Sequence, residues 1–181
     1  IGAGTTTYSK LLFSYNQPLK LGKFGILNNT IETGKIFGDA QLSVLSPVPA
    51  NQTYSLVANT FSLLNYYDFV VDQFLVGHFE HHFNGYILNK IPVIKKLKLR
   101  SLMTFRVVLG NISDSNTAIN RSSIIYNAPK ELYYEYGFGV ENIGFGNLRL
   151  FWIDCIWRSE FNNPNNSSPN FGVRLGMSPD F

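Results

Sequence analysis

The final segment of the chain constrains the fold more than any other stretch. Residues 170–181 alternate strictly, so that every second side chain is apolar and those between are polar or small. The apolar positions are Phe171, Val173, Leu175, Met177, Pro179 and Phe181. Such period-2 alternation predicts a β-strand with one apolar and one polar face. A strand of this length, when tilted, crosses an apolar band of ~25 Å. We therefore interpret it as the closing, membrane-inserting strand of an outer-membrane β-barrel.

Six further segments have the composition or the alternation of strands. In the fourth of them Leu102 and Val108 are apolar exceptions on a face that also carries Lys98. The six predicted strands are residues 5–15, 23–37, 73–85, 97–110, 132–142 and 147–159. With the final segment they make seven, whereas bacterial barrels close with about eight or more. We expect an all-β chain, with residues 1–181 forming the C-terminal part of one antiparallel transmembrane β-barrel. The start at Ile1 also suggests a piece of a longer chain or a processed product.

The connections between these strands alternate in length. Short turns are expected at residues 16–18 (Asn-Gln-Pro), around Asn89, Lys90 and Pro92, and at residues 143–146. Long polar connections are expected at residues 38–72, 111–130 and 160–169. Outer-membrane barrels have short periplasmic turns and long outside loops. This parity predicts that the C-terminus lies in the periplasm.

The longest connection, residues 38–72, has two different halves. Pro47 and Pro49 stand in a polar first half, whereas residues 60–69 (TFSLLNYYDF) are too aromatic for a disordered segment. Connections of this length are usually functional or disordered. We expect this loop to be extracellular or to fold into the lumen, with its second half packed on the barrel.

Composition excludes some classes of protein and leaves others open. Only 15% of the residues are charged and 15% are aromatic, which fits a lipid-facing barrel but also a soluble β-sandwich. The net charge is +3 and the sequence has no long run of one sign, so no nucleic-acid partner is expected. The longest uncharged run, residues 46–67, contains two prolines and cannot span a membrane as a helix. The single cysteine, Cys155, is interpreted as a packing residue.

Three metal-competent side chains lie on one face of the third predicted strand. His78, Glu80 and His82 alternate with His81, which points to the opposite face near an interface. Alternate residues on a strand are ~6.6 Å apart, so three in a row rarely converge on one ion. We favour a polar network over a metal site. No catalytic motif or cofactor-binding motif stands out, so we expect neither a cofactor nor an enzyme activity.

Charged side chains recur on the polar faces of several predicted strands. They could make the lumen selective for ions, or they could pair so that charge is tolerated inside a barrel, and we favour pairing. Lys98 is a further candidate cation on these faces. The predicted lumen-facing network is His78, Glu80, His82, Arg100, Arg106, Glu135, Glu141 and Arg174.

Several motifs resemble known barrel families. Residues 137–141 (GFGVE), 146–150 (GNLRL) and 170–176 (NFGVRLG) are similar to the C-terminal half of the surface-antigen barrel superfamily of assembly factors and two-partner secretion transporters. Residues 66–72 (YYDFVVD), 81–85 (HHFNG), 88–92 (LNKIP) and 95–100 (KKLKLR) resemble an uncharacterised outer-membrane family of Bacteroidota, which carries an N-terminal carboxypeptidase-regulatory-like domain. The resemblance covers about residues 24–181 and implies location and fold more than activity.

The chain departs from the better-known assembly factors at one feature. In those proteins an arginine at the tip of a long loop is pinned in the lumen by an acidic residue on a nearby strand. Residues 38–72 contain no arginine here, and the strand after the next turn carries Arg106 on its polar face. Because this contact between an arginine and an acid is absent, the resemblance implies an assembly or secretion activity less strongly.

The expected function is a non-enzymatic scaffold, assembly or export component in the bacterial outer membrane. Its partners would be outer-membrane lipid and other outer-membrane or periplasmic proteins. The alternatives are a solute channel, the C-terminal barrel part of a TonB-dependent-type transporter, and a soluble secreted β-domain.

Overall fold

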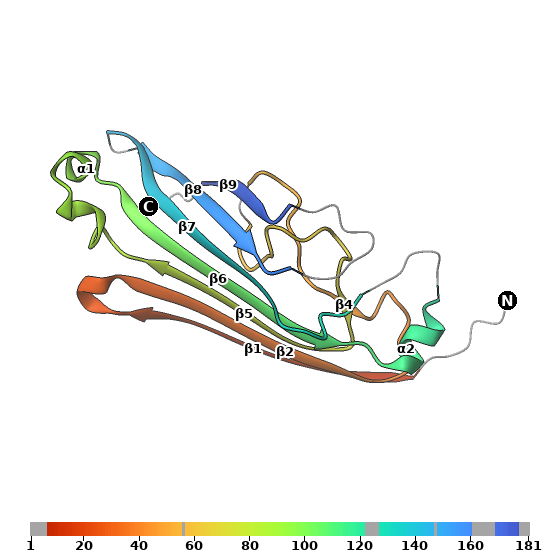
Figure 1. Cartoon of the computed structure of the whole chain (residues 1–181). Coiled ribbons are helices and arrows are strands. Elements are labelled where there is room, and N and C mark those ends of the chain that lie inside the picture. Colours follow the sequence, from red (N-terminus) through yellow and green to blue (C-terminus); the bar gives the residue numbers. More distant parts are fainter. Residues whose placement is uncertain (1–6, 56, 122–126, 147, 161–168, 178–181) are drawn as a thin grey trace.

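The computed structural model describes residues 7–55, 57–121, 127–146, 148–160 and 169–177. Nearly all of the regular structure is β (Figure 1). The strands are β1 (Tyr8–Lys20), β2 (Ile26–Gly38), β3 (Ser46–Pro47), β4 (Val70–Val71), β5 (Gln73–His82), β6 (Arg100–Asn111), β7 (Tyr133–Phe145), β8 (Leu148–Arg158) and β9 (Phe171–Met177). The short helices are η1 (Gly22–Phe24), η2 (Leu88–Lys90), α1 (Pro92–Leu97) and α2 (Asp114–Ile119).

Seven strands form one antiparallel sheet in the order β1-β2-β5-β6-β7-β8-β9. Every neighbour in the sheet is also the next long strand along the chain, which is the up-and-down arrangement expected from the alternating connections. The all-β, antiparallel, seven-stranded prediction is confirmed. Within the described residues the sheet is open, with β1 and β9 at its edges.

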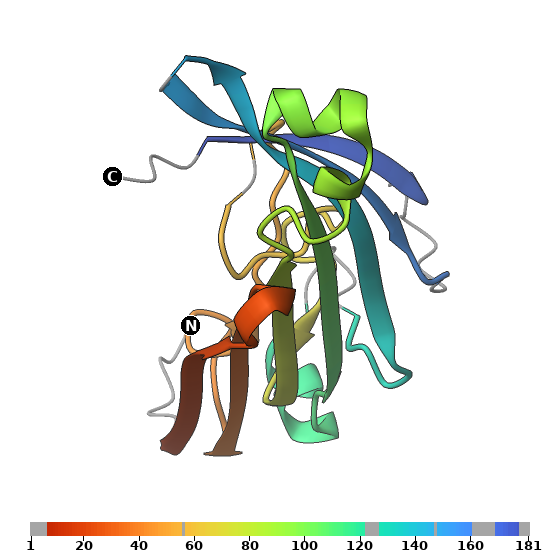
Figure 2. The same cartoon turned by 90° about the vertical axis from the view of Figure 1, so that its left-hand side faces the viewer.

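The sheet is strongly curved, and residues 39–55 and 57–72, which we call the inserted segment, lie in its hollow (Figures 1 and 2). We call the concave side the inner face and the convex side the outer face. Pro18 and Lys20 of β1 line the same cavity as Phe151 and Trp152 of β8, so the sheet brings distant strands toward each other across its inner face.

The register of the sheet divides the side chains between these faces. Across β5, β6 and β7 the pairs His78–Arg106 and Arg106–Glu135 lie on the inner face. Phe105 pairs with Tyr136 on the outer face. On β9 the predicted membrane-facing residues Phe171, Val173, Leu175 and Met177 are all exposed on the outer face. Pro179 and Phe181, which belong to the same prediction, lie outside the described residues.

Three of the predicted strand boundaries are wrong. The segment Asn16-Gln17-Pro18 is not a turn, because these residues pair with Thr30, Asn29 and Asn28 inside β1 and β2. The turn lies at residues 21–25, where Gly22 (φ 59°) and Gly25 (φ 103°) adopt left-handed backbone conformations that favour glycine.

The second correction concerns the connection between β5 and β6. It is not a short turn but holds η2 and α1, with Pro92 in the first turn of the helix, where a proline costs no hydrogen bond. Lys98 therefore ends α1 with a left-handed backbone (φ 53°) and does not belong to β6. Third, β7 continues through residues 143–145 with irregular register before it meets β8.

The core of the molecule lies between the inner face and residues 39–72. Phe61, Leu64 and Phe69 from that segment pack on Val76, Val108 and Tyr133 of the sheet. The expectation that the aromatic half of this segment packs on the sheet is confirmed. The segment also has order of its own, because β3 pairs with β4 and Asn51 N–H donates to Phe61 O at 2.8 Å.

A second contact ties the base of this segment to α2. Asp72 Oδ2 accepts hydrogen bonds from Ser113 N–H (2.7 Å) and Asn116 Nδ2 (2.9 Å). Asn116 Oδ1 in turn accepts the N–H of Ala40 at 2.8 Å. Both ends of the segment are thereby fixed to one short helix. Among the helices of the described residues, none is long and apolar enough to cross a membrane.

Candidate functional site

The centre of the inner face is a buried carboxylate that holds the backbone of the inserted segment. Glu135 on β7 is 0% exposed. Its Oε2 accepts the N–H of Ser62 at 2.7 Å, and its Oε1 accepts the N–H of Leu63 at 2.8 Å. The hydroxyl of Tyr133 donates to Oε1 at 2.8 Å. With three hydrogen bonds to its two oxygens, two of them from the backbone of the segment, Glu135 is the main polar anchor of the segment.

The same peptide is held from the other side by β9. The Arg174 guanidinium donates to the carbonyl oxygen of Ser62. On the same strand Gly172 leaves room for Leu63, since a Cβ at Gly172 would lie 2.7 Å from Leu63 Cδ2. The backbone at Ser62 and Leu63 is therefore fixed by a carboxylate, a guanidinium and a close packing contact.

Two guanidiniums stand beside this carboxylate in the register of the sheet. Glu135 pairs with Arg106 of β6 and Arg158 of β8, and both arginines are buried. Arg106 also lies 3.7 Å from Glu80 on β5. Since an unpaired charge is costly in a buried site, this arrangement places groups of opposite sign next to one another across four strands.

An aromatic layer covers the charged row on the loop side. The ring of Phe61 lies 5.2 Å from that of His78 and 5.6 Å from that of Tyr133, and Tyr133 contacts Phe69 at 5.4 Å. His78, Phe61 and Tyr133 are all buried. The layer excludes water from the contacts between Glu135 and the segment, which strengthens those hydrogen bonds.

Next to this row, two glycines make space for a second buried acid. Asp154 on β8 is 0% exposed and accepts a hydrogen bond from Thr104 Oγ1 at 3.1 Å. A Cβ at Gly137 would lie 2.5 Å from Thr104 Oγ1 and 2.8 Å from Asp154 Oδ1. At Gly139 a Cβ would lie 2.7 Å from the backbone oxygen of Ile153. Both glycines are thus required by the packing around Asp154.

The other half of the inner face encloses a polar cavity of about 550 Å³ near the short-turn end of the sheet. Its charged lining residues are Lys20, Glu80, His82, Arg100, Glu141 and Arg149. His82 Nδ1 and Glu141 Oε2 form a 2.7 Å pair. Arg149 is held by carbonyl oxygens of Gly146 and Asn142, both at 3.2 Å. The cavity presents charges of both signs to whatever solute or chain enters it.

The structure divides the predicted polar network into these two parts. His78, Arg106, Glu135 and Arg174 meet at the anchor of the inserted segment. Glu80, His82, Arg100 and Glu141 line the cavity, and the Glu80–Arg106 contact connects the parts. Lys98 lies in neither part. His81 is on the outer face, where it contacts the carbonyl of Phe24 at 2.9 Å and stacks on Phe83. Among the described residues no three His, Cys, Asp or Glu side chains are arranged to hold a metal ion.

The partner of Glu135 was missed by the sequence reasoning, although a signal was present. We expected Glu135 to pair with cations, whereas its shortest contacts are backbone N–H groups. The apolar exceptions were the signal: Val76, Val108 and Tyr133 form one row on an otherwise polar face. Such a row predicts that something apolar covers it.

A further carboxyl lies within the inserted segment itself. Burial raises the pKa of Asp68 above its ordinary range, against the opposing effect of the Asn65 backbone N–H, which lies 2.7 Å from Asp68 Oδ2. This bond closes the turn that precedes β4. The charge of Arg158, which stands beside Glu135 in the sheet, also acts on this carboxyl and lowers its pKa.

These features define an all-β protein with a curved antiparallel sheet, an apolar outer face and an ordered segment bound to a polar inner face. Residues 1–115 match the C-terminal domain of a family of unknown function, DUF5686, and the chain belongs to that family. The expectation of an uncharacterised family is confirmed at this level. No significant match was found among curated proteins or solved structures.

The family match covers β1 to β6 and the whole inserted segment. The inserted segment and the strands that carry Val76 and Val108 therefore lie within the matched domain. Glu135, Asp154 and Arg174 stand on the strands that follow.

Proposed function

We propose that this chain is part of an outer-membrane β-barrel of the surface-antigen type. In this proposal it acts without catalysis, as a scaffold, assembly or export component that works with other envelope proteins. The C-terminus lies in the periplasm, and outer-membrane lipid surrounds the outer face. The N-terminal carboxypeptidase-regulatory-like domain implied by the resemblance belongs to the same proposal.

The outer face is the observation that carries the proposal. Large apolar side chains stand exposed on it from β1 to β9, among them Leu11 (67%), Phe13 (61%), Leu75 (52%), Phe138 (53%) and Leu175 (55%). Soluble monomers rarely expose a contiguous apolar surface of this extent. A barrel strand alternates apolar-out and polar-in, and the charged rows described above lie on the inner face.

An aromatic row on this face adds to the support. Five register neighbours, Phe79, Phe105, Tyr136, Trp157 and Phe171, cross five strands side by side. The distances between ring centres are 6.3 Å at the β5–β6 step and 5.0 Å at the β8–β9 step. Tyr and Trp side chains are favoured where a membrane surface meets water.

The two ends of the sheet support the orientation. The connections that hold residues 39–72 and α2 leave one end, whereas the η1 turn, α1 and the β7–β8 turn lie at the other (Figure 1). Long connections are typical of the outside and short ones of the periplasm. The β5–β6 connection is longer than expected, but it folds compactly into η2 and α1.

A solute channel is the second candidate, and one observation favours it. The polar cavity with Arg100, Arg149 and Glu141 is the kind of lining through which ions or small polar solutes pass. The inserted segment opposes it, because Phe61 and Leu64 are packed on the inner face nearer the other end. A channel would therefore require that segment to move. The transporter alternative has the same requirement and has no separate observation in its favour.

Membrane insertion is tested by extraction of cell envelopes that contain the full-length protein. We expect the protein to stay in the pellet in carbonate at high pH and to dissolve only with detergent. Release of the protein by carbonate alone would contradict the membrane proposal.

The assembly role is tested separately by depletion. Loss of the protein should lower the amounts of other outer-membrane proteins in the envelope. Unchanged amounts, with normal insertion of this protein, would reject the assembly role and leave the barrel proposal standing.

A further inference from the structure

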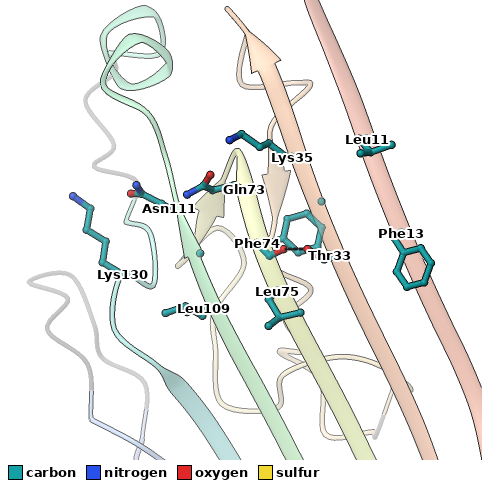
Figure 3. Close-up of a pocket in the computed structure, with 12 residues that line it drawn as sticks. Leu11, Phe13, Thr33, Lys35, Gln73, Phe74, Leu75, Leu109, Asn111 and Lys130 are labelled. Atoms are coloured by element: carbon teal, nitrogen blue, oxygen red, sulfur yellow. Dashed lines mark hydrogen bonds between the residues drawn. The ribbon is translucent and has the colours of Figure 1, made fainter.

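A groove crosses the outer face at the end of the sheet where the inserted segment leaves it. It has a volume of about 620 Å³ and lies over β1, β2, β5 and β6 (Figure 3). The groove is amphipathic. Lys35, Gln73, Asn111 and Lys130 gather at its outer end, and Phe13, Leu75 and Leu109 line the part toward the middle of the sheet.

The groove arises from one small side chain in a row of large ones. Thr33 stands between Phe13 and Leu75 in the register of β1, β2 and β5. Its Oγ1 donates to the backbone oxygen of Phe74 at 2.8 Å. Because the hydroxyl is bonded to the backbone, no free polar group remains on Thr33 to oppose an apolar occupant.

The charge of the groove is of one sign. Lys35 and Lys130 are both exposed, and no acidic side chain is among the residues that line it. Lys35 Nζ lies 5.2 Å from the ring centre of Phe37, which keeps the ammonium near the sheet. An anionic group bound here would also meet the side-chain amides of Gln73 and Asn111.

We propose that this groove binds one lipid whose headgroup carries a phosphate group and a net negative charge. The phosphate lies between Lys35 and Lys130, and an acyl chain lies over Thr33 against Phe13, Leu75 and Leu109. This inference rests on the proposed barrel, since it places the lysine end at the membrane surface. It adds the lipid class to that proposal.

The test uses the full-length protein in a mild detergent and native mass spectrometry with added lipid. Dioleoyl phosphatidic acid should bind more tightly than dioleoyl phosphatidylcholine. The double variant K35Q/K130Q should weaken phosphatidic acid binding roughly ten- to thirtyfold, as expected for two lysines near a lipid surface. Inorganic phosphate at millimolar concentration should not displace the lipid, because it lacks the acyl chain.

Lys95 and Lys96 provide a matched control, since they are exposed on α1 at the opposite end of the sheet. K95Q/K96Q changes the net charge equally and should leave the affinity unchanged. A third variant, Thr33→Phe, fills the groove and should weaken long-chain phosphatidic acid while leaving the lysines in place. Equal losses in both lysine pairs, or equal affinity for the two lipids, overturns the proposal.

The same preparation separates this failure from failure of the barrel proposal. Protein that resists carbonate but binds both lipids equally leaves the barrel standing without the groove. Protein released by carbonate removes the barrel, whatever the lipid result.

Discussion

At the scale of single residues, Glu135 shows how far a pattern of alternation reaches. Its position on a polar strand face was evident, because Glu135 and Gly137 alternate with the aromatic residues Tyr134, Tyr136 and Phe138. Its function as an acceptor for Ser62 and Leu63 was not, since those residues lie more than 70 positions earlier in the chain. Backbone N–H groups leave no trace in a sequence. The absent loop arginine therefore did not mean that an acid failed to hold the loop.

Glu135→Gln is expected to destabilise the fold by about 1–3 kcal/mol. The amide keeps one acceptor oxygen, so either Ser62 or Leu63 loses the partner of its buried N–H, which costs about that amount. Urea unfolding of the protein in detergent measures the change. Proteolysis at residues 39–72 should also become faster.

Glu131→Gln is the matched control, because Glu131 is exposed just before β7 and loses the same charge. It should change the free energy of unfolding by no more than about 0.5 kcal/mol. Equal unfolding free energies for the two variants would contradict the anchor at Glu135.

At the scale of elements, alternation located the strands well and their ends poorly. All seven long strands of the sheet were expected. Residues 5–15 were assigned from their composition and residues 23–37 from a weaker alternation, whereas the later strands show a period of two because one face is apolar and the other polar. The errors fall where local signals compete. Asn16-Gln17-Pro18 has turn chemistry, yet Pro18 is tolerated on β1 because edge strands need not donate on both sides. Residues 92–97 form a helix too short to show a helical period.

Leu175→Arg tests whether the outer face of β9 meets lipid. If Leu175 lies near the middle of the bilayer, the substitution should cost ~2–4 kcal/mol. Leu132 provides a matched control, because it is 56% exposed against 55% for Leu175 and immediately precedes β7. Leu132→Arg should cost only ~0–1 kcal/mol, as near a membrane surface.

The measurement for this pair is the free energy of unfolding in lipid vesicles. If the protein were a soluble sandwich, Leu175→Arg and Leu132→Arg would change the free energy of unfolding by small and similar amounts. A neutral Leu175→Arg would mean that the predicted facing of β9 is wrong.

At the scale of the whole molecule, the inserted segment bears on the choice between the candidate functions. Its ends are held by Asp72 and α2, its middle by Glu135 and Arg174, and its aromatic residues by Val76, Val108 and Tyr133. A segment fixed at three places is a structural part of the protein. This arrangement favours the proposed scaffold, assembly or export component over an open channel.

Removal of the segment is expected to turn the protein into a channel if the barrel proposal holds. Pro47 and Val70 are cross-strand partners in β3 and β4. Residues 48–69 can therefore be replaced by Asn-Gly, the pair preferred in two-residue hairpin turns. In planar bilayers the unaltered protein should conduct little, and the shortened protein should conduct at least severalfold more.

Because Val108 and Tyr133 lose their apolar cover, the shortened protein should also unfold at a lower temperature. Equal conductance, with the variant inserted and folded, would mean that residues 48–69 do not close the path through the barrel.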